Sequence, residues 1–288
     1  MKVLYKLHEI YAQIDFARRE GKTIGLVPTM GALHDGHLAL VRQSASQCEL
    51  TVATIFVNPT QFGPKEDLLR YPRTLDQDLT GLLQAGADFT FIPDAKEMYS
   101  EGHSTWIEPA EVAKPLEGDF RPGHYRGVAT IVLKLFNMIP ATIAYFGLKD
   151  YQQLLVIRRM VEDLNIPIRI EACTTIREPD GLAMSSRNRY LLPDERVKAT
   201  SLSRALARVE ELVHEGETDI LALESAMQWI LNEAGVTSID YARIVDAENL
   251  GTLTTVTASC VALIAARIGS TRLIDNRLLR KVECFSRS

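Results

Sequence analysis

Cysteine is scarce in this chain, and the four residues Cys48, Cys173, Cys260 and Cys284 are widely separated. None of them forms a C-x-x-C pair, and none lies near a histidine at the spacing of a zinc site. A chain of 288 residues can bury about three quarters of the surface that its unfolded form exposes, so it needs no disulfide or structural metal to fold. Scattered single thiols are typical of a reducing compartment, and we therefore expect a cytoplasmic protein.

The sequence also lacks a long apolar run and an excess of basic residues. Its longest uncharged stretch, residues 250–266, is rich in Thr and other β-branched residues, which favours a strand over a membrane span. Lys6, His8 and Glu9 interrupt the first ten residues, which is not expected of a signal peptide. The formal net charge is -5, whereas dedicated nucleic-acid binders carry a basic field. We therefore expect neither a membrane nor a nucleic acid among the partners.

The first half of the chain alternates short apolar runs with helical patterns. The expected strands are 24–29, 50–57, 89–92, 143–146 and 166–173, and the expected helices are 38–46, 75–83, 127–138 and 151–164. Strand–helix alternation of this kind predicts a parallel sheet that is covered by helices on both faces.

The pattern changes after about residue 176. Two helical stripes, 202–213 and 223–231, are followed by three β-rich stretches near 238–246, 254–265 and 270–280. Helices followed by adjacent strands predict a smaller α+β unit with an antiparallel sheet. We therefore predict an α/β protein with two domains. A Rossmann-like, doubly wound parallel sheet forms residues 1–176, and the smaller α+β domain forms residues 177–288.

Residues 28–37, P-T-M-G-A-L-H-D-G-H, lie between an expected strand and an expected helix. Gly31 and Gly36 allow the backbone to approach a ligand closely, and the helix that follows would point its N–H groups at an anion. His34 and His37 are three residues apart and can reach the same phosphate. The segment is not a Walker motif, because histidine and leucine stand where lysine and a hydroxyl residue should be. It predicts a nucleotide site, and the alternative is a glycine-rich turn with surface histidines.

A second polar segment, M-S-S-R-N at residues 184–188, follows the last expected strand of the first half. Its two serines and Arg187 offer hydroxyls and a bidentate guanidinium for phosphate oxygens, and the alternative is a polar turn. His34-Asp35-Gly36-His37 resembles the HIGH signature of the nucleotidylyltransferase superfamily. The second segment resembles the KMSKS signature of the same superfamily without its usual lysines, so Arg187 takes the cationic role.

Further segments make the resemblance more specific. They are residues 28–34, V-N-P-T-Q-F at 57–62, Y-P-R at 71–73, R-P-G-H at 121–124, F-G-L-K-D-Y-Q-Q at 146–153, and residues 184–188. In this order, almost from end to end, the chain resembles the pantoate–β-alanine ligase family. Leu148 departs from the pattern, because the family usually has an acidic residue there. We expect the Leu148 side chain to point away from the ligand.

The resemblance implies a reaction in two steps. Pantoate attacks the α-phosphate of Mg²⁺-bound ATP and gives pantoyl adenylate and pyrophosphate, and β-alanine then attacks the acyl carbon and gives pantothenate and AMP. Mg²⁺ is expected to be held mainly by phosphates and water, without dedicated protein ligands. The family also implies a homodimer.

The resemblance implies roles for individual residues. The expected catalytic residues are His34, His37, Lys149 and Arg187, which would supply hydrogen-bond donors and positive charge to the phosphates. The expected ATP contacts are Met30, Gly31, Ala32, Leu33, His34, Asp35, Gly36, His37, Gly147, Leu148, Lys149, Asp150, Ile176, Met184, Ser185, Ser186 and Arg187. The expected pantoate contacts are Asn58, Gln61, Arg121 and Gln153, and Gln61 is also expected to contact β-alanine.

Two of these residues can be interpreted from their position as well. Lys149 follows the end of an expected strand, so it should lie on the same sheet edge as His34 and His37. Asp150 is expected to bind the ribose hydroxyls, as the family suggests, to cap the helix that begins at Tyr151, or to do both.

The residues leave three alternatives open. They are another adenylate-forming or nucleotidyl transferase with a different acceptor, a tRNA-charging enzyme, and a nucleotide-binding relative without activity. The absence of a basic face and of room for an anticodon-binding domain argues against the second. Intact His34, His37 and Lys149 argue against the third.

Overall fold

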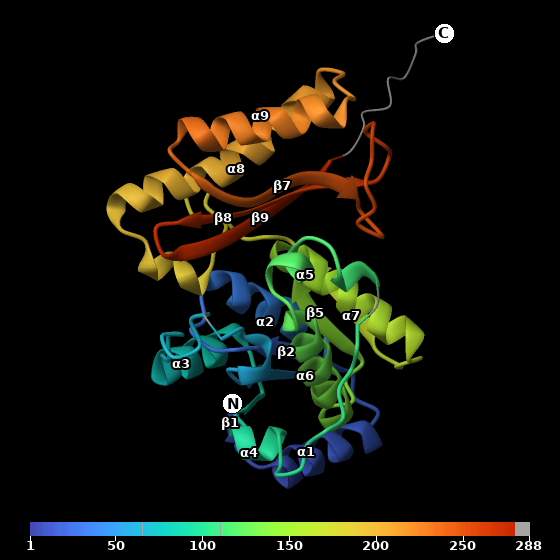
Figure 1. Ribbon diagram of the computed structural model, residues 1–288. Helices are drawn as coiled ribbons and strands as arrows, with labels where there is room; N and C mark the ends of the chain where they lie inside the picture. The colour runs from blue at the N-terminus through green and yellow to red at the C-terminus, as the bar shows by residue number, and fades with distance from the viewer. Residues whose placement is uncertain (65, 110, 280–288) are drawn as a thin grey trace. The chain divides into compact units, whose positions relative to one another are not determined.

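The computed structural model describes residues 1–64, 66–109 and 111–279, so Cys284 lies outside the described residues. The chain divides into two compact units, Met1–Ile176 and Arg177–Ser288, and each is described by itself (Figure 1). Within the described ranges, we find no helix with the length and apolar character needed to cross a membrane.

The first unit is built on a six-stranded sheet in the order β1-β4-β3-β2-β5-β6, in which every neighbouring pair is parallel. Its strands are β1 (Lys2–Leu4), β2 (Ile24–Thr29), β3 (Leu50–Ile55), β4 (Phe89–Phe91), β5 (Ile143–Gly147) and β6 (Arg169–Cys173). The central strands β2, β3 and β5 are almost entirely buried, which explains why each reads as a continuous apolar run.

Helices lie on both faces of this sheet. They are α1 (Leu7–Arg19), α2 (Asp35–Gln47), α3 (Leu75–Ala85), α4 (Ala95–Met98), α5 (Glu117–Phe120), α6 (His124–Met138) and α7 (Tyr151–Asp163), with 3₁₀ turns η1 (Pro59–Gln61), η2 (Glu111–Ala113) and η3 (Leu148–Asp150). One core joins one face of the sheet to α1, α6 and α7, and a second core joins the other face to α2 and α3. Successive residues of β5 alternate between the two, since Phe146 lies in the first core and Tyr145 in the second.

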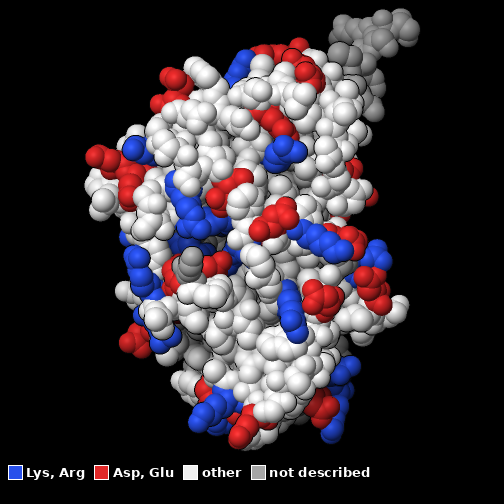
Figure 2. All heavy atoms as spheres, viewed as in Figure 1, with Lys and Arg blue, Asp and Glu red and all other residues white. Residues whose placement is uncertain are grey.

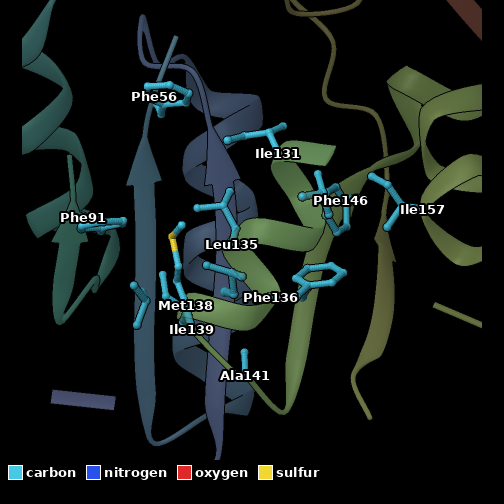
Figure 3. Packing of buried hydrophobic residues seen from close by; sticks show 14 of the residues in the cluster. Phe56, Phe91, Ile131, Leu135, Phe136, Met138, Ile139, Ala141, Phe146 and Ile157 are labelled. Atoms are coloured by element: carbon cyan, nitrogen blue, oxygen red, sulfur yellow. The ribbon is translucent and has the colours of Figure 1, made fainter. Parts of the chain in front are cut away.

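Helix α6 is the most deeply buried helix of this unit. Its side chains Ile131, Leu135 and Phe136 point toward the central strands, where Phe136 meets Phe146 of β5 edge to face (Figure 3). Burying one such side chain stabilises the fold by about 1.5–3 kcal/mol relative to leaving it exposed. The doubly wound parallel sheet that the sequence predicts is therefore confirmed.

The second unit packs two helices on a three-stranded antiparallel sheet in the order β7-β8-β9. Its elements are η4 (Ser186–Tyr190), α8 (Pro193–His214), α9 (Ile220–Glu233), β7 (Ser238–Asp246), β8 (Cys260–Ile268) and β9 (Thr271–Leu279). The expected α+β composition is confirmed, but β8 begins six residues later than the predicted stretch 254–265. Before β8 the chain makes isolated bridges instead, of Thr252 with Val245 of β7 and of Thr255 with Asp219.

Candidate active site

Three segments leave the carboxyl ends of the central strands. β2 continues into residues 30–34, β3 into η1, and β5 into η3. Strand β2 lies between the other two, with Thr29 opposite Ile55 of β3 and Leu26 opposite Ala144 of β5. Connections therefore run in opposite directions on either side of β2. This is the switch point at which doubly wound sheets bind their ligands.

The loop after β2 has an unusual backbone. Gly31 and Ala32 have φ values of +80° and +49°, in the left-handed region. The carboxylate of Asp78, on α3, accepts hydrogen bonds from Ala32 N at 2.9 Å and from Leu33 N at 2.8 Å. The hydroxyl of Thr74 also donates to this carboxylate, at 3.0 Å. Asp78 therefore fixes the backbone of the loop, a role that the sequence did not predict.

The two histidines of the loop are held as a pair. His34 is the N-cap of α2, and its Nδ1 accepts a hydrogen bond from Gly36 N at 3.2 Å. His34 N lies 3.4 Å from Nδ1 of His37, to which it donates, and the two ring centroids are 4.1 Å apart. Because Nδ1 of His37 is an acceptor, a neutral His37 carries its proton on Nε2.

His37 is neutral at neutral pH. Burial lowers the pKa of His37 to about 4; the carboxylate of Asp150 opposes this shift and the ammonium of Lys149 adds to it. A neutral His37 offers an N–H donor and no positive charge, and its contact with a phosphate stays a prediction. The effect of Asp150 and Lys149 on His37 shows that the end of β5 lies near the start of α2, as the sequence predicts for Lys149.

The β5 end contributes an amine and a carboxylate. Nζ of Lys149 lies 3.9 Å from Oδ1 of Asp150, and their side chains are 19% and 49% exposed. Asp150 is the N-cap residue of α7, as expected, but its side chain makes no capping hydrogen bond with the backbone of the helix. Leu148 packs against the core, as expected for a side chain that points away from a ligand. A Cβ built on Gly147 would meet nothing nearer than Lys149 N at 4.0 Å, so this glycine leaves open space beside the strand end.

The segment after β3 presents an oriented amide. Asn58 is 1% exposed; its Oδ1 accepts from Tyr99 OH at 2.8 Å, and its Nδ2 donates to Gly127 O and to Oε1 of Gln61 at 3.2 and 3.1 Å. The protein itself thus uses both donors of Asn58, and its direct contact with pantoate stays a prediction. The shared hydrogen bond orients Gln61, whose Nε2 lies 3.0 Å from the weak acceptor Sδ of Met30.

Helix α6 packs closely against η1 at Gly127. A Cβ built on Gly127 would lie 2.6 Å from the carbonyl carbon of Thr60 and 2.8 Å from Gln61 N. Only glycine allows the backbone of α6 to approach η1 this closely. Gly127 is a second functional position that sequence reasoning missed.

Arg121 also acts on Gln61 within the protein. Its guanidinium forms two 2.7 Å hydrogen bonds with Glu66 and lies 3.0 Å from Nε2 of His124. A guanidinium only donates, so Nε2 of His124 accepts and Nδ1 donates to Gln61 O at 2.8 Å. Burial, and then Arg121, lower the pKa of His124 to about 4, which keeps this ring neutral. The direct contact of Arg121 with pantoate stays a prediction.

The adjacent glutamines of α7 have different surroundings. Gln152 is 3% exposed, and its amide bonds the backbone of Val112, Pro115 and Glu117 at 2.8, 2.7 and 3.1 Å. Gln153 is half-buried, and its side chain has no hydrogen-bond partner among the residues that the structure describes. Gln152 therefore holds a loop, whereas the amide of Gln153 remains available.

The second signature belongs to the second unit. Oγ of Ser185 accepts from Arg187 N at 3.3 Å and caps η4, and Ser186 is buried. The side chain of Asn188 donates to Ala183 O at 3.1 Å and to Glu178 at 2.8 Å, which fixes the end of the segment. The predicted ATP contacts of Met184–Arg187, and of Ile176 at the end of the first unit, stay predictions.

Charge on the surface is mixed. On the face that Figure 2 shows, Lys and Arg side chains are interspersed with Asp and Glu side chains. Over the described ranges, we find no group of three or more His, Cys, Asp or Glu residues that could hold a metal ion.

Comparison with known proteins shows the family to which the chain belongs. The family model described as pantoate-beta-alanine ligase matches residues 2–278. The chain is 51% identical to a pantothenate synthetase of Rhodopirellula baltica, over 94% of this chain and 99% of the relative. It is 53% identical to one of a Roseiflexus species, over 89% and 92%.

Solved structures lead to the same family. The pantothenate synthetase of Thermus thermophilus superposes with a TM-score of 0.92 at 43% identity, covering 96% of this chain and 99% of that one. A pantoate-beta-alanine ligase of Francisella tularensis, complexed with beta-gamma ATP and beta-alanine, gives a TM-score of 0.81 at 34% identity, covering 96% and 97%. The chain therefore belongs to the pantoate–β-alanine ligase family.

Proposed function

We infer that this chain is a ligase that joins pantoate to β-alanine, with ATP as the second substrate, and forms pantothenate. The family match over residues 2–278 carries the inference. The Francisella relative, complexed with beta-gamma ATP and beta-alanine, supports ATP as substrate. The site residues proposed below rest on the geometry at the ends of β2, β3 and β5.

In the first step, a carboxylate oxygen of pantoate bonds to the α-phosphorus of ATP as the bond to pyrophosphate breaks. Two anions must meet, so donors aimed at the phosphates stabilise the transition state. Lys149 supplies the permanent charge, and neutral His37 supplies an N–H from Nε2. His34 orients His37 through its backbone N–H. Asp150 makes no side-chain capping hydrogen bond at the start of α7, and its carboxylate is suited to the ribose hydroxyls.

Pantoate itself is a hydroxylated anion, and neutral amides can bind it without burying another charge. Gln61 and Gln153 are the proposed amides. Gln61 is oriented by Asn58 through its side chain and by His124 through its carbonyl. Its Nε2 has only a thioether as acceptor, so a substrate oxygen would replace a weak contact with a strong one. In the second step, the β-alanine amine attacks the acyl carbon and AMP leaves, with Gln61 close to the amino acid.

We also propose that Mg²⁺ enters with ATP. The side chains at the strand ends are mainly amines, imidazoles and amides, whereas Mg²⁺ prefers oxygen ligands. These residues therefore fit a cation that the triphosphate and water hold. Contacts of Ile176, Ser185, Ser186 and Arg187 with ATP, a homodimer, and action in the cytoplasm are further proposals that the family resemblance supports.

A product assay tests the function. ATP, pantoate and β-alanine together should yield pantothenate, AMP and pyrophosphate, and omission of any one should stop the overall reaction. Without β-alanine, pantoate should still support exchange of pyrophosphate into ATP. Exchange that strictly requires β-alanine would contradict the stepwise mechanism. Exchange that depends on a different acid would contradict pantoate as the substrate.

Adjacent glutamines offer a matched test of the pantoate site. Gln153→Ala should raise the KM for pantoate and leave the Tm and the KM for ATP nearly unchanged. Gln152→Ala should lower the Tm, because it leaves three backbone groups without their partner. If Gln153→Ala impairs ATP as much as pantoate, this amide lies in a different part of the site.

A further inference from the structure

Asp78 is buried where the catalytic loop needs a fixed backbone. The residue is 3% exposed, and both carboxylate oxygens are engaged: Oδ2 by Ala32 N, and Oδ1 by Leu33 N and Thr74 Oγ1. A Cβ on Gly31 would lie 3.1 Å from Oδ2, so the glycine leaves room for the carboxylate. Two successive N–H groups of the loop thus converge on one anion that the protein provides.

This contact is made at the expense of the helix that carries it. Thr74 is the N-cap of α3, yet its side chain caps no backbone N–H of the helix and donates to Asp78 instead. Asp78 lies in the first turn of the same helix. Residue types that normally satisfy a helix terminus are therefore directed at the loop after β2.

The contact also distinguishes this loop from a phosphate-binding P-loop. In a P-loop, the backbone N–H groups themselves surround the phosphates. Here Ala32 N and Leu33 N donate to Asp78 instead. The loop therefore presents side chains, those of His34 and His37, to its ligand. The direction of His34 and His37 then depends on how firmly the carboxylate holds the loop.

We propose that Asp78 is a positioning residue for the first half-reaction: its carboxylate fixes the left-handed backbone at Gly31–Ala32 and thereby aims His34 and His37 at the phosphates. The proposal rests on the proposed function of this site. Asp78 does not touch the reacting atoms; it acts through the two backbone hydrogen bonds.

Asp78→Asn tests this, because it keeps the size of the side chain but gives one of the two backbone N–H groups an amide NH₂ in place of an acceptor. Pantoate-dependent exchange of pyrophosphate into ATP should lose roughly 10- to 100-fold in kcat, as a displacement of the histidines by up to about 1 Å predicts. The KM for pantoate should stay within about threefold, since Gln61 and Gln153 lie on other segments.

Glu224→Gln is the matched control. Glu224 is a buried carboxylate of the second unit whose Oε1 accepts from Ile244 N at 2.8 Å, so its loss should lower the Tm without affecting exchange. Should Asp78→Asn fail to fold, Thr74→Val removes only the hydroxyl that donates to Asp78 and should lower kcat several-fold. Unchanged kcat in the folded variant, or a loss no larger than in Glu224→Gln, would overturn the proposal. Wild-type protein without pantoate-dependent exchange would instead overturn the proposed function.

Discussion

Replacing Gly127 with alanine should damage pantoate use through a single added methyl group. The new Cβ would lie 2.6 Å from the carbonyl carbon of Thr60 and 2.8 Å from Gln61 N, both of them backbone atoms. Ordinary contact begins at 3.4 Å, so the backbone of η1 must retreat by about 0.8 Å. Gln61 moves with it, and its hydrogen bond with Asn58 lengthens.

The magnitude follows from this displacement. A misplacement of about 1 Å at a positioned group costs on the order of 100-fold in rate, so kcat/KM for pantoate should fall by roughly 10- to 100-fold. Overpacking lowers the free energy of unfolding by about 1–3 kcal/mol, whereas alanine in place of glycine within a helix raises it by about 1 kcal/mol. The variant should therefore fold with a modestly lower Tm and bind ATP nearly normally.

Gly81→Ala is the control for Gly127→Ala. Gly81 also lies inside a helix, α3, but its added Cβ would meet only the flexible end of Leu38 at 3.2 Å. Steady-state kinetics with varied pantoate, together with a thermal melt, separate the two variants. A wild-type kcat/KM for pantoate in folded Gly127→Ala would refute the argument that η1 cannot move without loss of function.

The remaining predictions concern the β5 end and the buried histidines. Gly147→Ala should leave the Tm unchanged, because its φ of -77° suits alanine and, its chain neighbours apart, the new Cβ would meet nothing nearer than Lys149 N at 4.0 Å. It should raise the KM for ATP, and an unchanged KM would show that ATP does not bind beside Gly147. Lys149→Ala should lose roughly 100- to 1,000-fold in pantoate-dependent exchange and retain most of its ATP affinity, because its charge acts chiefly in the transition state. It should react nearly normally with preformed pantoyl adenylate, and equal damage to both half-reactions would contradict the assigned role. The pKa of His37 and that of His124 are about 4 in the folded protein, against an ordinary value of 6.5. The unfolded chain therefore binds more protons between these values, so the free energy of unfolding should fall as the pH drops from 6.5 toward 4. Urea unfolding at pH 7 and pH 5 measures this, His124→Gln should weaken the dependence, and greater stability at pH 5 would contradict it.

The parts of the site that could be predicted from the sequence are those that depend on local order along the chain. β2 and β5 are buried apolar runs, and the residues that follow such runs share one sheet edge. His37 and Lys149 could therefore be placed near each other from the sequence, and the electrostatic effect of Lys149 on His37 agrees. The parallel sheet followed from the same runs, whereas β1 is too short, at three residues, to give a periodic signal.

The residues that were missed act through contacts between distant segments. Asp78 is 46 positions from Ala32, and Gly127 is 69 from Asn58. Neither has an unusual local sequence, since an acidic residue in a first helical turn and a glycine in a helix are both ordinary. The difference between Gln152 and Gln153 is likewise invisible locally, because it depends on which side of α7 meets the loop at 112–117.

The two supports lie on opposite faces of the sheet. Helix α3, which carries Asp78, packs in the core shared with α2, whereas α6, which carries Gly127, packs in the core shared with α1 and α7. The loop after β2 is thus fixed from one face and η1 from the other, and the contact of Gln61 with Met30 is a direct link between them. Because each support acts on its own segment, the proposed ATP and pantoate sites should respond separately to substitutions at Asp78 and Gly127. Disturbances that reach the Gln61–Met30 contact should be coupled, since residues in contact do not contribute additively.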